Sequence, residues 1–303
     1  MTATRDSGLA RAAALAAAAL LLGLLLASAP GAAASKKKKR PAKAKKPTPT
    51  AVPRPADPYR VTIDTADGVR LAASYRPVPG LPGAPAVLLL HDFSRDRREW
   101  EPMAPEWAAR GLATRAIDLR GHGESTRKAS GEAVKLSPRL MSDPKGFPRD
   151  VEAASAWLRS RSASVGALGL STGASLAVIA AARGWADAAV AVSATVDRLG
   201  DLAGGALPAP RSTLVLAAVD DPGREASARS LDEAGLPPKK LVLLPGAAHN
   251  RALLDEHPDA RAAAIGWMAE RLGAVAPPAP TSTPTRAPAA TPTASAPAPP
   301  QGT

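Results

Sequence analysis

A serine, an aspartate pair and a histidine, which are the residue types that activate a serine hydroxyl, each follow a predicted strand. Ser171 lies in the pentapeptide 169–173, which reads G-x-S-x-G. The pair Asp220-Asp221 follows the apolar run 213–219, and His249 follows a later apolar run and the tetrapeptide Pro-Gly-Ala-Ala. A serine hydroxyl is a poor nucleophile at neutral pH, so it needs a base within hydrogen-bond reach and a third group that orients the base. The order Ser, Asp, His therefore predicts nucleophilic catalysis.

The setting of the pentapeptide supports this prediction. The apolar run 164–168 comes before it and the alanine-rich run 174–182 comes after it, which predicts strand, tight turn and helix. Glycines on both sides of the serine let strand and helix approach closely while the hydroxyl stays exposed. The pentapeptide alone is weak evidence, because a Gly-Ser turn between a buried strand and a helix would look the same.

The rest of the chain alternates between strand and helix patterns. A hairpin is expected over residues 59–75. Continuous apolar or β-branched runs predict strands at 84–91, 112–118, 187–193, 213–219 and 240–244, and apolar stripes predict helices at 100–110, 149–159, 224–234 and 255–272. This alternation predicts an α/β fold whose mostly parallel sheet carries helices on both faces. Active sites of such sheets lie beyond the carboxyl ends of the strands.

Residues 58–275 resemble a compact member of the α/β-hydrolase superfamily. Residues 87–93 resemble the strand that leads into the family's His-Gly loop, and residues 118–125 resemble its D-x-R-G-H-G-x-S segment. The G-x-S-x-G pentapeptide matches the nucleophile elbow, and residues 245–249 resemble the loop of the catalytic histidine.

The resemblance implies a role for each of the three side chains. Ser171 would be the nucleophile and His249 the general base. Asp221 would orient the base, because residues 218–221 match the family's G-x-x-D spacing at the end of this strand. Asp220 is the alternate acid, and Asp197 is a more distant alternative.

The resemblance also places an oxyanion hole at the backbone N–H groups of Phe93 and Thr172. One departure concerns this hole, because Asp92 stands where the family usually has glycine. A carboxylate there could repel the oxyanion, point to solvent, or pair with Arg95 or Arg98.

The remaining polar residues are expected to have structural roles. We expect His91 and His122 to bond loop backbones and Asp118 and Arg120 to brace the loop that contains them. We expect His257 at the surface of the final helix.

No large lid is expected over the site. The segment 194–212 is long enough for a loop and one short helix, and segment 125–145 is the other candidate cover, with Leu136, Leu140 and Met141 available to line a pocket. A small cover disfavours substrates selected by a large cap, such as those of proline-releasing aminopeptidases. An elbow serine disfavours dehalogenase and dienelactone-hydrolase chemistry.

Both ends of the chain have the composition of non-globular segments. Residues 1–34 resemble a signal peptide, with two arginines, an apolar stretch and Ala-Ala-Ala as the cleavage site. An uncleaved membrane anchor is the alternative. Residues 35–57 form a Lys/Pro-rich stretch and residues 276–303 a Pro/Ala/Thr-rich stretch, both predicted to be disordered. We therefore expect a protein that is secreted, periplasmic or on the cell surface.

The net charge of +12 is concentrated in the N-terminal segment. Residues 1–60 contain 12 basic and 2 acidic side chains, which leaves 27 basic and 25 acidic ones for the remaining residues. A nearly neutral domain with few aromatic residues disfavours nucleic-acid binding. The lysine-rich linker would contact an anionic membrane or cell-wall polymer, or act as a solubilising spacer.

The sequence predicts neither a metal nor a cofactor, because it has no cysteine and its four histidines lack metal-ligand spacing. The main hypothesis is an exported, monomeric serine hydrolase that cleaves small-molecule or acyl esters through an acyl-enzyme. The alternatives are a serine peptidase or amidase with the same triad, and a non-catalytic surface-binding module.

Overall fold

The computed structural model describes residues 57–206 and 209–277. The predicted signal peptide lies outside these residues. So do the predicted linker up to residue 56 and the predicted tail from residue 278.

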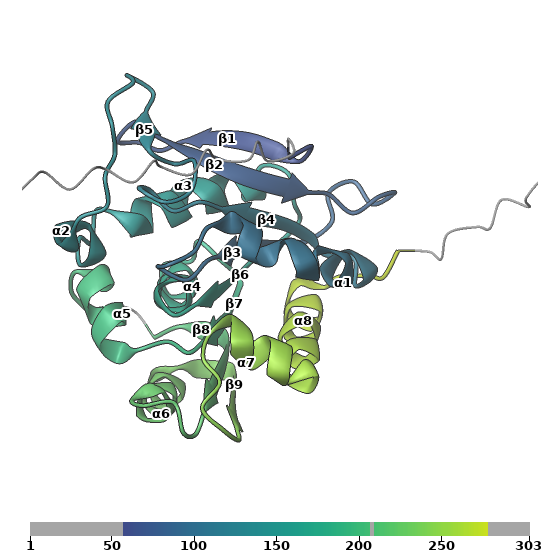
Figure 1. Cartoon of the computed structure of the whole chain (residues 1–303). Helices are drawn as coiled ribbons and strands as arrows, with labels where there is room; N and C mark the ends of the chain where they lie inside the picture. Colours follow the sequence, from purple (N-terminus) through teal and green to yellow (C-terminus); the bar gives the residue numbers. More distant parts are fainter. Residues whose placement is uncertain (1–56, 207–208, 278–303) are drawn as a thin grey trace, which may run out of the picture. The chain divides into compact units, whose positions relative to one another are not determined.

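The described residues form an α/β fold around a sheet of nine strands (Figure 1). The strands are β1 (Arg60–Asp64), β2 (Val69–Arg76), β3 (Ala86–Leu90), β4 (Ala113–Ile117), β5 (Arg127–Lys128), β6 (Val165–Leu170), β7 (Ala188–Val192), β8 (Arg211–Ala218) and β9 (Leu236–Leu244). Their order is β1-β2-β4-β3-β6-β7-β8-β9, and the short β5 pairs with β2. Strands β4 to β9 along this path are parallel, and the β1-β2 hairpin joins β4 antiparallel. The predicted fold class and the N-terminal hairpin are therefore confirmed.

Helices cover both faces of the sheet. They are α1 (Ala104–Ala109), α2 (Pro138–Met141), α3 (Phe147–Arg159), α4 (Thr172–Ala182), α5 (Val196–Ala203), α6 (Arg224–Ala234), α7 (Arg251–Glu256) and α8 (Pro258–Leu272), with a 3-10 segment η1 (Arg97–Met103) before α1. Each face of the sheet has its own hydrophobic core. One core is formed with η1, α1, α7 and α8, and the other with α3 and α4. Strands β3, β6 and β7 are buried along their whole length. This explains their continuous apolar sequences, because each side chain faces a helix layer.

Two predicted helices have different boundaries in the structure. The predicted helix 100–110 begins as the 3-10 segment η1, in which Pro102 lacks an N–H for an α-helical bond. The predicted helix 255–272 is two helices, and His257 lies between them. Its φ of −120° and ψ of 81° are non-helical because the next residue is Pro258. The placement of His257 within one final helix is therefore wrong.

Among residues 57–206 and 209–277, no large lid covers the carboxyl edge of the sheet. Between β7 and β8 the described residues contain only the short α5, and the segment after β4 contributes only β5 and α2. No helix in residues 57–206 and 209–277 is both long and apolar enough to cross a membrane.

Candidate active site

Ser171 lies on the tight turn between β6 and α4. Its φ of 51° and ψ of −110° are strained values for a residue other than glycine, and its N–H donates to the Val192 carbonyl of the neighbouring strand at 3.0 Å. A Cβ at Gly169 would lie 2.0 Å from the Gly173 carbonyl oxygen, and one at Gly173 would lie 2.3 Å from the Leu90 carbonyl oxygen. Both glycines are therefore required for this turn, which presents the serine beyond the sheet edge.

Asp221 and His249 lie together beyond the carboxyl ends of β8 and β9. The Asp221 Oδ2 atom lies 2.6 Å from His249 Nδ1. Asp221 is buried, whereas the His249 side chain is 39% exposed, so its ring can be reached from solvent. The hydrogen bond puts the ring proton on Nδ1 and leaves Nε2 as the basic nitrogen.

The two alternate acids lie elsewhere. Asp220 is exposed, and its backbone N–H donates to the Gly246 carbonyl at 2.9 Å. Asp197 is an exposed residue in the first turn of α5. Of the three carboxylates considered from the sequence, Asp221 is the one that contacts the histidine.

His91 orients the peptide that contains the Phe93 N–H. The Leu119 N–H donates to His91 Nε2 at 3.0 Å, so the ring proton is on Nδ1 and is donated to the Asp92 carbonyl at 2.6 Å. The Asp92 carbonyl and the Phe93 N–H belong to one trans peptide and point in opposite directions. By holding the carbonyl, His91 therefore turns the Phe93 N–H away from its own ring. Burial lowers the pKa of His91 to about 4, which keeps the ring neutral.

His122 holds the next peptide of the same loop. Its Nε2 lies 2.7 Å from the Phe93 carbonyl oxygen, and its ring contacts the Phe93 ring edge-on. Both histidines thus bond loop backbones, as the sequence predicts. Within the described residues, no hydrogen bond engages the Ser171 hydroxyl or the N–H groups of Phe93 and Thr172.

Asp92 pairs with neither of the two arginines considered from the sequence. Its Oδ1 accepts hydrogen bonds from the Ser94 N–H at 2.7 Å and the Ser94 hydroxyl at 3.0 Å. Its Oδ2 accepts a hydrogen bond from the Asn250 side-chain amide. Three donors therefore engage the carboxylate.

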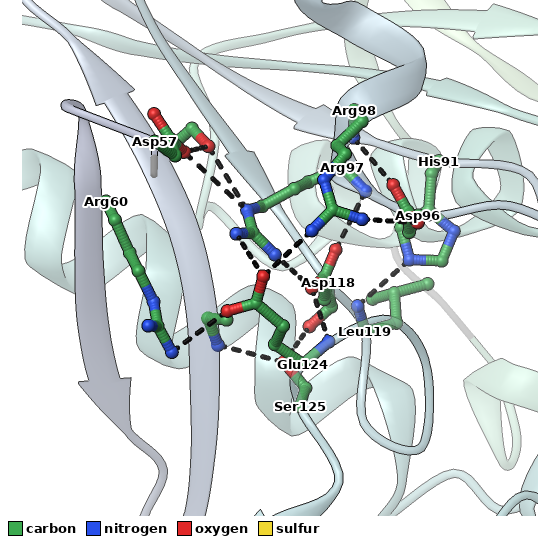
Figure 2. Close-up of polar contacts among 12 residues, drawn as sticks. Asp57, Arg60, His91, Asp96, Arg97, Arg98, Asp118, Leu119, Glu124 and Ser125 are labelled. Atoms are coloured by element: carbon green, nitrogen blue, oxygen red, sulfur yellow. Dashed lines mark hydrogen bonds and ion pairs between the residues drawn. The ribbon is translucent and has the colours of Figure 1, made fainter. Parts of the chain in front are cut away.

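A network of ion pairs around the buried Arg97 and Asp118 braces the segment that follows the loop after β3 (Figure 2). The guanidinium of Arg97, which is only 2% exposed, pairs with Asp118 and also contacts Glu124 at 3.0 Å. Backbone N–H groups of Arg97 and Glu124 each donate to the Asp118 carboxylate at 2.8 Å. Burial raises the pKa of Asp118, and these N–H donors oppose that shift. Glu124 also pairs with Arg60 and Arg98, both at 2.9 Å.

A second buried pair holds the turn after β4. Arg120 Nε donates to Asp150 Oδ1 at 2.8 Å, and its terminal nitrogens donate to Asp67. Burial raises the pKa of Asp150 to about 6, and Arg120 opposes the shift. Asp118 and Arg120 thus brace the loop that contains them, as the sequence predicts.

Sequence reasoning missed Asn250, Glu99 and Arg97. Asn250 immediately follows His249, and its place in the chain is the only signal that could have indicated it. Glu99 and Arg97 precede the predicted helix 100–110 in a charged stretch that carries no burial signal, although Arg97 is buried. In the described part of the chain, no group of three His, Asp or Glu side chains is arranged to hold a metal ion.

The site contains the kinds of group that acyl transfer uses, and within the described residues no hydrogen bond joins the Ser171 hydroxyl to His249. It offers a hydroxyl on a strained turn, an imidazole oriented by a carboxylate, and two N–H groups that no other group engages.

A family model described as the alpha/beta hydrolase family matches residues 87–208. This span includes Ser171 and ends before Asp221 and His249. Curated relatives match over a short stretch. One is a 2-succinyl-6-hydroxy-2,4-cyclohexadiene-1-carboxylate synthase from Salmonella heidelberg, 49% identical over 49 residues, which are 16% of this chain and 19% of the relative. The chain thus spans about a fifth of the length of the curated relatives it matches.

Solved structures share the fold over most of the described residues. An α/β serine hydrolase without lid from Xanthomonas campestris has a TM-score of 0.56 and 18% identity, over 73% of this chain and 98% of that one. An esterase from Pyrococcus furiosus has a TM-score of 0.53 and 16% identity, over 70% of this chain and 90% of that one. A dienelactone hydrolase from Anabaena variabilis has a TM-score of 0.52 and 22% identity, over 70% and 94%. At these identities the similarity shows the α/β-hydrolase fold alone.

Proposed function

Given that this chain is an α/β-hydrolase by fold, we propose that it is a serine hydrolase that cleaves carboxylic esters through an acyl-enzyme. The observation that carries the proposal is the 2.6 Å contact between Asp221 and His249 beyond the sheet edge that also carries Ser171. A carboxylate, an imidazole and a serine in this chain order are the partners that activate a serine hydroxyl.

In the proposed reaction, Ser171 Oγ attacks the ester carbonyl carbon while His249 Nε2 takes the hydroxyl proton. Asp221 accepts the Nδ1 hydrogen bond and stabilises the imidazolium that forms. The oxygen of the tetrahedral intermediate accepts hydrogen bonds from the Phe93 and Thr172 N–H groups. Each such donor contributes roughly 3 kcal/mol of transition-state stabilisation.

The rest of the reaction releases the two products. His249 returns the proton to the leaving alcohol, and the acyl group stays on the serine. A water molecule then attacks the acyl-enzyme with His249 again as base, which releases the acid. The exposed histidine and the absence of a large lid in the described residues favour an open site that small acyl esters can reach.

We also propose that the chain is exported, on the strength of residues 1–34. The measurement is the N-terminal residue of the protein recovered from the extracytoplasmic fraction. A new N-terminus near residue 35 is expected, and an intact N-terminus in the membrane fraction would replace cleavage with anchoring.

The test of the activity is hydrolysis of p-nitrophenyl acetate, butyrate and octanoate, with the matching p-nitroanilides alongside. Wild-type turnover of the esters is expected, with a loss of roughly 10³-fold or more in Ser171→Ala. Faster turnover of the anilides would indicate a peptidase or amidase. A chain that turns over neither series and is not labelled by a fluorophosphonate would be a binding module.

A further inference from the structure

Two loops that are far apart in sequence meet beside the candidate catalytic groups. Asp92 lies in the loop after β3, directly before Phe93, and Asn250 directly follows His249. The Asn250 side-chain amide donates a hydrogen bond to Asp92 Oδ2. Because the acceptor is a carboxylate, this bond is charge-assisted and stronger than one between neutral groups.

Asn250 is itself held rigidly. It is 8% exposed, and its backbone N–H donates to the buried Ser193 hydroxyl at 3.0 Å. Its φ of 54° is a value that residues other than glycine adopt rarely, and Ser171 and Ser193 have similar positive φ values. Strained backbone of this kind persists where surrounding contacts impose it, and it gathers at functional sites.

A second contact joins the helical segments that follow these two loops, α7 and η1. The guanidinium of Arg251 donates to the Glu99 carbonyl oxygen, and the Glu99 side chain accepts the Asp92 N–H at 3.1 Å. The segment around His249 is thus joined to the loop after β3 directly through Asn250, and indirectly through Arg251 and Glu99.

We propose that Asp92 and Asn250 are positioning residues that hold the Phe93 N–H and the His249 ring in one fixed relation. The inference rests on the proposed function, since it concerns the same oxyanion donor and general base. The Asp92 carboxylate holds the peptide after Phe93 by accepting the Ser94 N–H, and the peptide after His249 is held by its Asn250 N–H, which donates to the Ser193 hydroxyl. The hydrogen bond between the Asp92 and Asn250 side chains links these two peptides. Neither side chain touches the reacting atoms in this account. A displacement of about 1 Å between catalytic groups costs roughly 100-fold in rate.

The pair allows an exchange experiment. Asn250→Asp places two carboxylates against each other, and aspartate has nearly the same size and shape as asparagine. Asp92→Asn in the same chain restores a donor and an acceptor, because the new amide oxygen can keep the Ser94 contacts while its nitrogen faces the new carboxylate. In Asp92→Asn alone, the Asn250 amide can turn over and present its oxygen, which has no hydrogen-bond partner in the described structure. Asp64→Asn is the matched control, because Asp64 is an exposed residue of β1 paired with Arg70.

The full chain and these variants are compared in kcat and KM for p-nitrophenyl butyrate. Asn250→Asp is expected to lower kcat roughly 10- to 100-fold with a small change in KM, since positioning affects the transition state. Adding Asp92→Asn is expected to recover most of that loss, and Asp64→Asn is expected to match wild type. A folded Asn250→Asp chain with wild-type kcat would overturn the proposal, as would a loss that Asp92→Asn does not recover.

Unfolding in urea tests the contact separately from the activity. Asn250→Asp is expected to raise the equilibrium constant for unfolding. Adding Asp92→Asn is expected to lower that constant again, by roughly tenfold, toward the wild-type value. Additive effects of the two substitutions would overturn the link even in an active enzyme. A wild-type chain without turnover or fluorophosphonate labelling would overturn the proposed function, and with it the positioning role. In that case the unfolding measurements still test whether Asp92 and Asn250 are in contact.

Discussion

Acid should destabilise this protein through His91. The ring accepts the Leu119 N–H at Nε2 and donates to the Asp92 carbonyl from Nδ1, so both nitrogens are committed to the neutral form. Protonation would place a second donor opposite the Leu119 N–H, in a site with no exposure to water. Burial accordingly lowers the pKa of His91 to about 4.

The sign and size of the effect follow from this pKa. An unfolded histidine titrates at about 6.5, so the unfolded chain binds the proton more readily than the folded chain between about pH 6.5 and 4. The contribution to stability is fully present above about pH 6.5 and is lost as the pH falls toward 4. Between about pH 7 and pH 4.5 the loss from His91 is on the order of 2 kcal/mol.

The assay is urea unfolding of the full chain at these two pH values, with His91→Asn and His91→Gln beside wild type. Both variants are expected to lose less stability on acidification than wild type, by on the order of 2 kcal/mol, because neither carries a titrating ring. The asparagine nitrogen lies near the position of Nδ1 and can still donate to the Asp92 carbonyl, whereas the glutamine amide lies nearer Nε2. Ester hydrolysis should therefore survive better in His91→Asn. Equal acid sensitivity in all three chains would show that His91 is not the source of the acid destabilisation, and so would a His91 that titrates near 6.5 by NMR.

Three further predictions follow from single contacts. Asp221→Asn should lower kcat for ester hydrolysis by roughly 10⁴-fold, as the same change does in other triads. The control Asp220→Asn should keep a kcat within about threefold of wild type in the same assay. Gly173→Ala should abolish fluorophosphonate labelling and lower the melting temperature, because its Cβ would lie 2.3 Å from a β3 carbonyl oxygen. Arg115→Met should leave the free energy of unfolding unchanged or raise it by about 1 kcal/mol. The buried Arg115 guanidinium stacks on Trp157 at 3.4 Å and has no hydrogen-bond partner in the described structure, so a clear loss of stability in urea would contradict this.

Local patterns in the sequence predicted most of the fold. The continuous apolar runs that became β3, β6 and β7 are diagnostic because strands covered on both faces exclude polar residues. The candidate site was predictable for a related reason. Its residues directly follow parallel strands, whose carboxyl ends share one edge of the sheet.

Elements held by non-local contacts were not predictable. Strand β9 begins at Leu236, earlier than expected, because Leu236 and the exposed Lys239 and Lys240 pair with β8 through the backbone. The Pro-Pro-Lys-Lys stretch carries no apolar signal. The contact between Asp92 and Asn250 spans 158 residues, and no local pattern reports it. The choice between Asp220 and Asp221 likewise depended on which way the turn after β8 points its two carboxylates.

Ser171 as the nucleophile is tested by covalent labelling of the full chain with a fluorophosphonate, followed by intact-mass measurement and peptide mapping. We expect one adduct per chain, located on Ser171, with no adduct in Ser171→Ala and slow labelling in Asp221→Asn. An adduct on another residue, or none on a folded wild-type chain, would contradict this role of Ser171.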